Sequence, residues 1–130
     1  KIGNLLAVMC KNGTKVVEAI KKNGSSADIA VFEDIWQKEC ESLAVYFNEL
    51  NPNYWPKDLM AELLINLTNF WIDDFRARVD KDFAEDAVAL DNILKVAVIG
   101  ITDHARSGYS SIADVLSRGV IAQFPLSFVA

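Results

Sequence analysis

The sequence predicts an all-α fold, a single-domain irregular or orthogonal bundle of five to six helices around a central hydrophobic helix at about residues 57–80. Three observations lead to this prediction. Apolar residues recur at helical spacing along the chain, helix-capping residues separate these segments, and the segment 57–80 is apolar on nearly all sides. At 130 residues, the chain has the size of one domain and can bury a sizeable core. We therefore expect one helical domain over residues 1–130.

Two short helices are expected at the N-terminus. The first contains Ile2, Leu5, Leu6 and Met9, and the pair Asn12-Gly13 should end it, because both residue types tolerate the left-handed conformation found at helix ends. The second begins at Thr14 and ends at Asn23-Gly24 by the same argument.

The third helix should run from Ser26 or Asp28 to Leu50. Its apolar positions are separated by steps of three and four residues, which places them on one face: Ile29, Phe32, Trp36, Cys40, Leu43, Phe47 and Leu50. The opposite face is polar, so this helix is expected to bury one side.

The central helix follows the break at Asn51-Pro52-Asn53. Between Lys57 and Asp80, one narrow stripe is polar and most other positions are apolar. A helix of this kind needs neighbours on several sides. The polar stripe consists of Asp58, Glu62, Asn66, Asn69, Asp73, Arg76 and Asp80.

Two more helices are expected beyond the central one, at about residues 83–106 and from Ser111 to Gly119. A second interpretation treats residues 95–130 as strand, loop, helix and strand, a nucleotide-binding unit. The loop from Gly100 to Gly108 matches neither GxGxxG nor GxxxxGK[ST], so this interpretation has no phosphate-binding motif behind it.

The final eleven residues, 120–130, carry no charge and are rich in large apolar groups. An apolar end of this composition is expected to pack on the core of its own chain, with a homodimer as the alternative.

The charge distribution argues against nucleic acid as a partner and for a basic protein. The chain has a net charge of −5, whereas binding to phosphate backbones requires dense Lys and Arg. Residues 1–22 carry five basic residues and one acid, while residues 23–86 carry five basic residues and fourteen acids. The acidic middle is an ordinary solvated surface, or it faces the basic N-terminal region, or it meets a basic partner.

No cofactor, metal or catalytic set is expected. Cys10 and Cys40 form no CxxC pattern, the chain has one histidine, and both thiols are expected to be buried. The acidic run from Asp73 to Asp86 lacks the paired ExxE and ExxD spacing of helical magnesium sites, and Asp74 and Arg78 are placed to form a helix salt bridge.

No apolar run reaches the 18–20 or so residues of a membrane-spanning helix. A cytoplasmic location is expected, with a secreted one as the alternative because of three glycosylation-type sequons.

The leading hypothesis is a non-enzymatic interaction protein, an adaptor, inhibitor or immunity-type domain, that presents an acidic surface to a basic protein partner. The alternative is an enzyme or small-ligand carrier with an interhelical pocket that uses Asp73, Glu62 and His104. The candidate binding residues are Asp58, Glu62, Asn66, Asn69, Asp73, Trp55 and His104.

Overall fold

The computed structural model describes residues 1–23, 25–100 and 111–124. It confirms the all-α fold class, since the described residues form five α-helices and one short π-helical segment and contain no strand. The helices are α1 (Ile2–Lys21), α2 (Ser26–Leu50), α3 (Lys57–Asp80), α4 (Phe83–Leu94) and α5 (Ile112–Gln123), with the π-helical segment at Lys95–Ile99 after α4.

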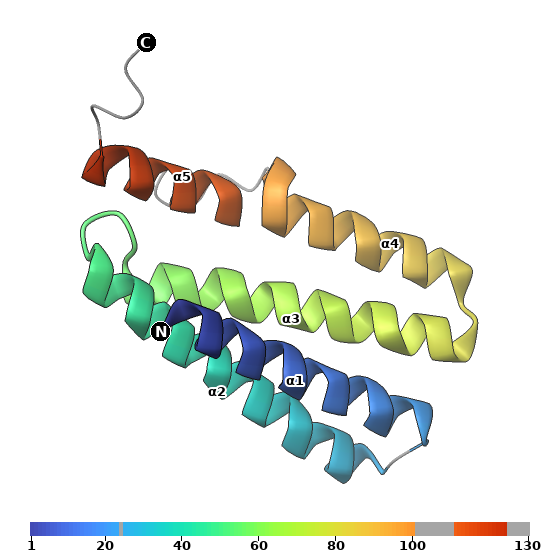
Figure 1. Cartoon of the computed structure of the whole chain (residues 1–130). Helices are drawn as coiled ribbons and strands as arrows, with labels where there is room; N and C mark the ends of the chain where they lie inside the picture. The colour runs from blue at the N-terminus through green and yellow to red at the C-terminus, as the bar shows by residue number, and fades with distance from the viewer. Residues whose placement is uncertain (24, 101–110, 125–130) are drawn as a thin grey trace.

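Helix α3 contacts all four other helices and has the bounds expected from the sequence. In Figure 1, α1 and α2 lie on one side of α3, whereas α4 and α5 follow one another along its other side. Met60, Leu63 and Leu64 of α3 join the core shared with α2 and α5, and Ile72 joins a second core cluster with Val16 and Trp36. The all-round apolar character of α3 therefore reflects burial from several directions.

The expected break at Asn12-Gly13 is wrong, because α1 continues through both residues. Gly13 is buried against the indole of Trp36 in α2, and a Cβ atom on Gly13 would lie 2.9 Å from Cζ2 of that ring. The missing side chain lets the two helices approach closely. The expected end at Asn23 is confirmed, since α1 ends at Lys21 and Asn23 takes a left-handed φ of 50°.

In α5, as in α1, a glycine that was expected to end a helix lies inside it. Helix α5 starts where expected, with the Ser111 hydroxyl accepting a hydrogen bond from the Asp114 amide, but it continues past Gly119 to Gln123. Gly119 lies against Trp55, and a Cβ atom there would be 2.2 Å from the indole Nε1. Gly119 is thus a contact residue inside a helix, and the expectation that it ends α5 is wrong.

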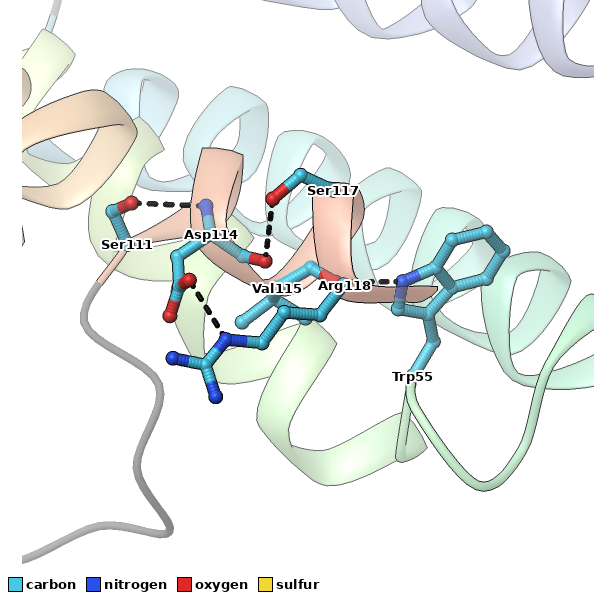
Figure 2. Close-up of polar contacts among 6 residues, drawn as sticks. All are labelled: Trp55, Ser111, Asp114, Val115, Ser117 and Arg118. Carbon is cyan, nitrogen blue, oxygen red and sulfur yellow. Dashed lines mark hydrogen bonds and ion pairs between the residues drawn. The ribbon is translucent and has the colours of Figure 1, made fainter. Parts of the chain in front are cut away.

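Three hydrogen bonds dock α5 on the end of α2 and on the loop between α2 and α3. The Trp55 indole N–H donates to the Val115 carbonyl at 3.0 Å, as Figure 2 shows. The Asn51 side chain donates to the Gly119 carbonyl at 3.2 Å, and the Gln123 side chain donates to the Leu50 carbonyl at 2.8 Å. Trp55 is 4% exposed, so its ring packs in the core and its one donor is satisfied.

The helix expected at 83–106 ends earlier. Helix α4 passes into the π-helical segment, which closes with a bond from the Gly100 amide to the Lys95 carbonyl, and Gly100 has a φ of 104° that suits glycine. Lys95–Ile99 and α5 are helical, so the nucleotide-binding interpretation fails for the described part of 95–130. Residues 101–106 lie outside the described residues.

The expectation that the uncharged C-terminal segment is buried is not met where the segment is described. Val120, Ile121 and Phe124 are exposed, and residues 125–130 lie outside the described part. No helix among the described residues is long and apolar enough to cross a membrane.

The two cysteines differ in environment, and both are free. Cys40 is buried in the core, and burial raises the pKa of its thiol to about 11. Cys10 is exposed, so the expectation of two buried thiols is wrong for Cys10. The unbroken α1 helix places this residue at its surface instead of in the core.

We predict that replacing Gly119 with alanine lowers the free energy of unfolding by about 2 kcal/mol or more, because the new methyl group overlaps a buried ring. Urea unfolding followed by circular dichroism measures this change. Gly3→Ala is the matched control, since no atom lies within 4 Å of its would-be Cβ. It should leave stability unchanged or raise it by up to about 1 kcal/mol through helix propensity. Equal effects of the two substitutions would contradict the contact argument.

The cysteines should also differ in reactivity. The thiolate is the attacking species, so burial and the raised pKa of Cys40 protect it in the folded protein. Iodoacetamide at about pH 8 should modify Cys10 in the native state and both thiols in denaturant, as mass spectrometry of proteolytic fragments can show. Fast modification of Cys40 under native conditions would contradict the buried position.

Candidate functional site

An acidic groove of about 430 Å³ lies between α3 and α4. Its walls carry four carboxylates, and two alanines, Ala77 and Ala89, are buried beneath it. Small residues at these two positions let the helices approach while the longer polar side chains project along the opening. The polar residues that line it are Asp73, Arg76 and Asp80 from α3, Asp82 from the connection, and Glu85 and Asn92 from α4.

The short connection between the helices brings the carboxylates together. Lys81 ends α3 in a left-handed conformation with a φ of 58°, and Asp82 caps α4 by accepting a hydrogen bond from the Glu85 amide at 3.1 Å. Helix α4 then runs back along α3, as Figure 1 shows. The acidic end of α3 therefore faces the acidic first turn of α4.

The groove carboxylates are not neutralised by neighbouring side chains within the described structure. Its one cation, Arg76, forms a hydrogen-bonded ion pair with Glu33 of α2. Asp73, Asp80 and Glu85 have no ion pair among the described residues. The groove consequently carries excess negative charge.

The basic N-terminal helix does not balance this charge. Of the five α1-region lysines, Lys1 pairs with Glu49 at 3.7 Å. The others, Lys11, Lys15, Lys21 and Lys22, are exposed and have no ion pair in the described part of the chain. The idea that the basic and acidic regions complement each other internally thus gains no support here.

The polar stripe expected on α3 borders α2 on one side and the acidic groove on the other. Asn69 accepts a hydrogen bond from the Gln37 side chain of α2 at 3.2 Å, and Arg76 reaches Glu33 of the same helix. Asp73 and Asp80 lie in the groove, and Arg76 also lines it. The remaining stripe residues Asp58, which is exposed, and Glu62 and Asn66, which are half-buried, do not line it.

Two other candidate residues lie away from the groove or outside the described structure. Trp55 is buried and bonded to α5, which leaves its ring fully engaged in packing. His104 lies outside the described residues. The structure instead adds Asp80, Asp82 and Glu85, and their signal in the sequence was the acidic run that continues across a helix break.

A buried carboxylate lies beside the groove, on the interface between α3 and α4. Arg78 donates to Asp74 at 3.0 Å and to Asp86 at 3.1 Å, which confirms the expected Asp74–Arg78 pair and extends it to α4. Asp74 is 1% exposed, and its Oδ1 has no hydrogen-bond partner among the described residues. Burial raises the pKa of Asp74, the nearby Asp86 raises it further, and Arg78 acts in the opposite direction.

Apolar groups stand next to the acidic ones. Phe83, the first residue of α4, is 77% exposed, and Val88 is 54% exposed and lines the groove. Large exposed apolar side chains beside charged ones are typical of interaction surfaces. Among the described residues, no group of His, Cys, Asp and Glu side chains is arranged to hold a metal ion.

Comparisons with protein families, with characterised proteins and with solved structures give no match to this chain.

We predict a pH-dependent contribution from Asp74. A carboxyl group whose pKa is raised on folding binds protons more tightly in the native state, so its contribution to stability falls as pH rises from its ordinary value of 3.8 through the folded value. Asp74→Asn removes this titration. The stability of the variant relative to the native sequence should therefore increase over this pH range and then level off, as urea unfolding at a series of pH values can measure.

A matched control for this series is Asp91→Asn, because Asp91 also pairs with a basic residue four positions away, Lys95, but is exposed. Its stability difference should change little over the same range. A difference for Asp74→Asn that shrinks with rising pH would contradict the assigned direction.

Proposed function

We propose that this chain is a non-enzymatic binding protein that accepts a basic protein partner in the acidic groove between α3 and α4. The observation behind the proposal is the set of groove carboxylates Asp73, Asp80 and Glu85, which have no cation of their own in the described structure. Like charges held close together repel one another, and a partner with Lys or Arg side chains relieves that repulsion.

The apolar groups around the groove indicate the form of the partner. Phe83 and Val88 offer contacts that a purely charged ligand would not use. A segment that places basic residues over the carboxylates and apolar residues over Phe83 satisfies both sets of groups. An amphipathic basic helix has this character because its two kinds of residue occupy different faces.

The alternative of an enzyme or carrier based on Asp73, Glu62 and His104 receives no support from the described residues. Asp73 lines the groove, Glu62 is not among its lining residues, and His104 lies outside the described part.

The groove hypothesis predicts selective loss of binding when its carboxylates are neutralised. The probe is a synthetic amphipathic helical peptide of lysine and leucine, titrated into isotope-labelled protein while amide resonances are recorded. Resonances of α3 near Asp73 and of α4 should shift. The double variant Asp73→Asn with Glu85→Gln should bind the peptide about tenfold more weakly at low salt, and added salt should weaken binding of the native sequence.

The control variant carries Glu18→Gln with Glu41→Gln, which changes net charge equally at exposed positions outside the groove. It should alter affinity by no more than about twofold. Equal losses in both double variants would show attraction to overall charge and would refute a defined site, as would resonance shifts located away from α3 and α4. A peptide with glutamate in place of lysine should not bind.

A further inference from the structure

A second groove, of about 570 Å³, lies between α1, α2 and α3 and contains no charged residue. Its size falls within the range of sites for small organic molecules. Most of its lining is aliphatic or aromatic, and its polar members are two threonines and a cysteine. Its lining residues include Met9, Thr14, Trp36, Thr68, Trp71 and Phe75.

Three aromatic rings form one wall of this groove. The Trp36 and Phe75 rings are stacked, with an interplanar angle of 8° and centroids 6.5 Å apart. Trp71 lies 5.7 Å from Phe75 at an interplanar angle of 32°. Trp71 and Phe75 are both half-buried, so parts of these rings are open to a ligand. Such a surface favours flat, aromatic molecules.

The polar groups of the groove leave one hydrogen-bonding requirement unmet. The Thr14 hydroxyl donates to the Cys10 carbonyl at 3.1 Å, and the Thr68 hydroxyl donates to the Ile65 carbonyl at 2.8 Å. Trp36, which is 6% exposed, has an indole N–H with no acceptor in the described structure. Buried polar groups without a partner are uncommon in folded proteins, and each one needs a physical explanation.

We propose that this groove binds an uncharged, planar aromatic molecule that carries one carbonyl-type acceptor, and that Trp36 donates its indole N–H to that acceptor. The lack of charge in the lining argues against carboxylates and phosphates, because their desolvation would not be compensated. This site is separate from the acidic groove and does not depend on the function proposed for it.

Entry of the acceptor requires a small rearrangement at α1. The Trp36 N–H is covered by surrounding atoms of the protein, and a Cβ atom on Gly13 would lie 3.2 Å from Cε2, the ring atom to which Nε1 is bonded. Two α1 side chains line the same groove: Leu6, which is exposed, and Met9, whose unbranched side chain adapts to different shapes. Binding requires that side chains such as these shift to give the acceptor access to the donor.

The test compares three compounds of similar shape: acetylnaphthalene, ethylnaphthalene, which lacks the acceptor, and naphthoate, which is charged. Binding is followed by quenching of tryptophan fluorescence and by the indole N–H resonances, with the Trp36 signal assigned by substitution. Acetylnaphthalene should bind roughly five- to tenfold more tightly than ethylnaphthalene and should shift the Trp36 N–H resonance downfield, as expected for a new hydrogen bond. Naphthoate should bind most weakly.

Two variants test the location without altering the buried rings. Thr14→Phe places a large side chain at the groove and should weaken acetylnaphthalene binding about tenfold or more. Ser42→Phe is the matched control, since Ser42 is also an exposed hydroxyl residue that donates to the carbonyl four residues earlier, but it lies on α2 outside the groove. It should leave affinity unchanged within about twofold.

Several results would overturn the proposal. Equal affinity for acetylnaphthalene and ethylnaphthalene with an unmoved Trp36 resonance would remove the hydrogen bond, and equal losses in the Thr14→Phe and Ser42→Phe proteins would remove the location. Concentration-dependent dimerisation that Thr14→Phe abolishes would show that a second copy of the chain covers the groove in place of a small molecule.

Discussion

The positions of the two outer helices α1 and α5 depend on close contact between a glycine and a buried tryptophan. Gly13 of α1 lies on Trp36, and Gly119 of α5 lies on Trp55. Neither contact leaves room for a Cβ atom, so the large ring and the missing side chain form a complementary pair. Around the second pair, the hydrogen bond from Trp55 to Val115 fixes the orientation of α5, and the Asn51 side chain bonds to the carbonyl of Gly119 itself. Much of the remaining architecture follows, because α1 and α5 both contact α3 and these two points fix how closely they approach α2 and the loop between α2 and α3.

Helix α3 supplies residues to two grooves of opposite chemical character. Asp73 and Asp80 belong to the opening shared with α4, whereas Trp71 and Phe75 belong to the opening shared with α1 and α2. This arrangement is possible because successive residues on a helix point in different directions, so one segment can place carboxylates and aromatic rings on separate surfaces. The acidic opening gains its charge from two helix ends that meet at a tight connection. The aromatic opening depends on the stacking of rings from α2 and α3. The two sites therefore share a scaffold but no lining residue.

The periodic parts of the fold were predictable from the sequence, and the specific contacts were not. The bounds of α3 and the last residue of α2 agree with the structure because apolar spacing and the Asn51-Pro52 break determine them locally. Gly13 and Gly119 lie inside helices where the sequence predicted helix ends, since glycine both ends helices and permits close packing, and a single sequence does not show which large residue lies opposite. The acidic run from Asp73 to Asp86 was visible, but its convergence depends on how α4 folds back on α3. Trp55 lies in a loop bounded by prolines, and such a position does not by itself indicate a buried ring. The burial of Trp55 becomes apparent only when α5, which contacts it, is placed.

Among the described residues, helix α4 contacts α3 and the π-helical segment and no other element. By contrast, α1, α2 and α3 contact one another. An element held on one side makes fewer buried contacts and opens at lower free energy than one held on several sides. Backbone amides of α4 would then exchange with solvent through excursions that leave the three-helix packing intact. Such an excursion would dismantle the acidic groove and preserve the aromatic one, so the two recognition surfaces would have different lifetimes within one folded molecule.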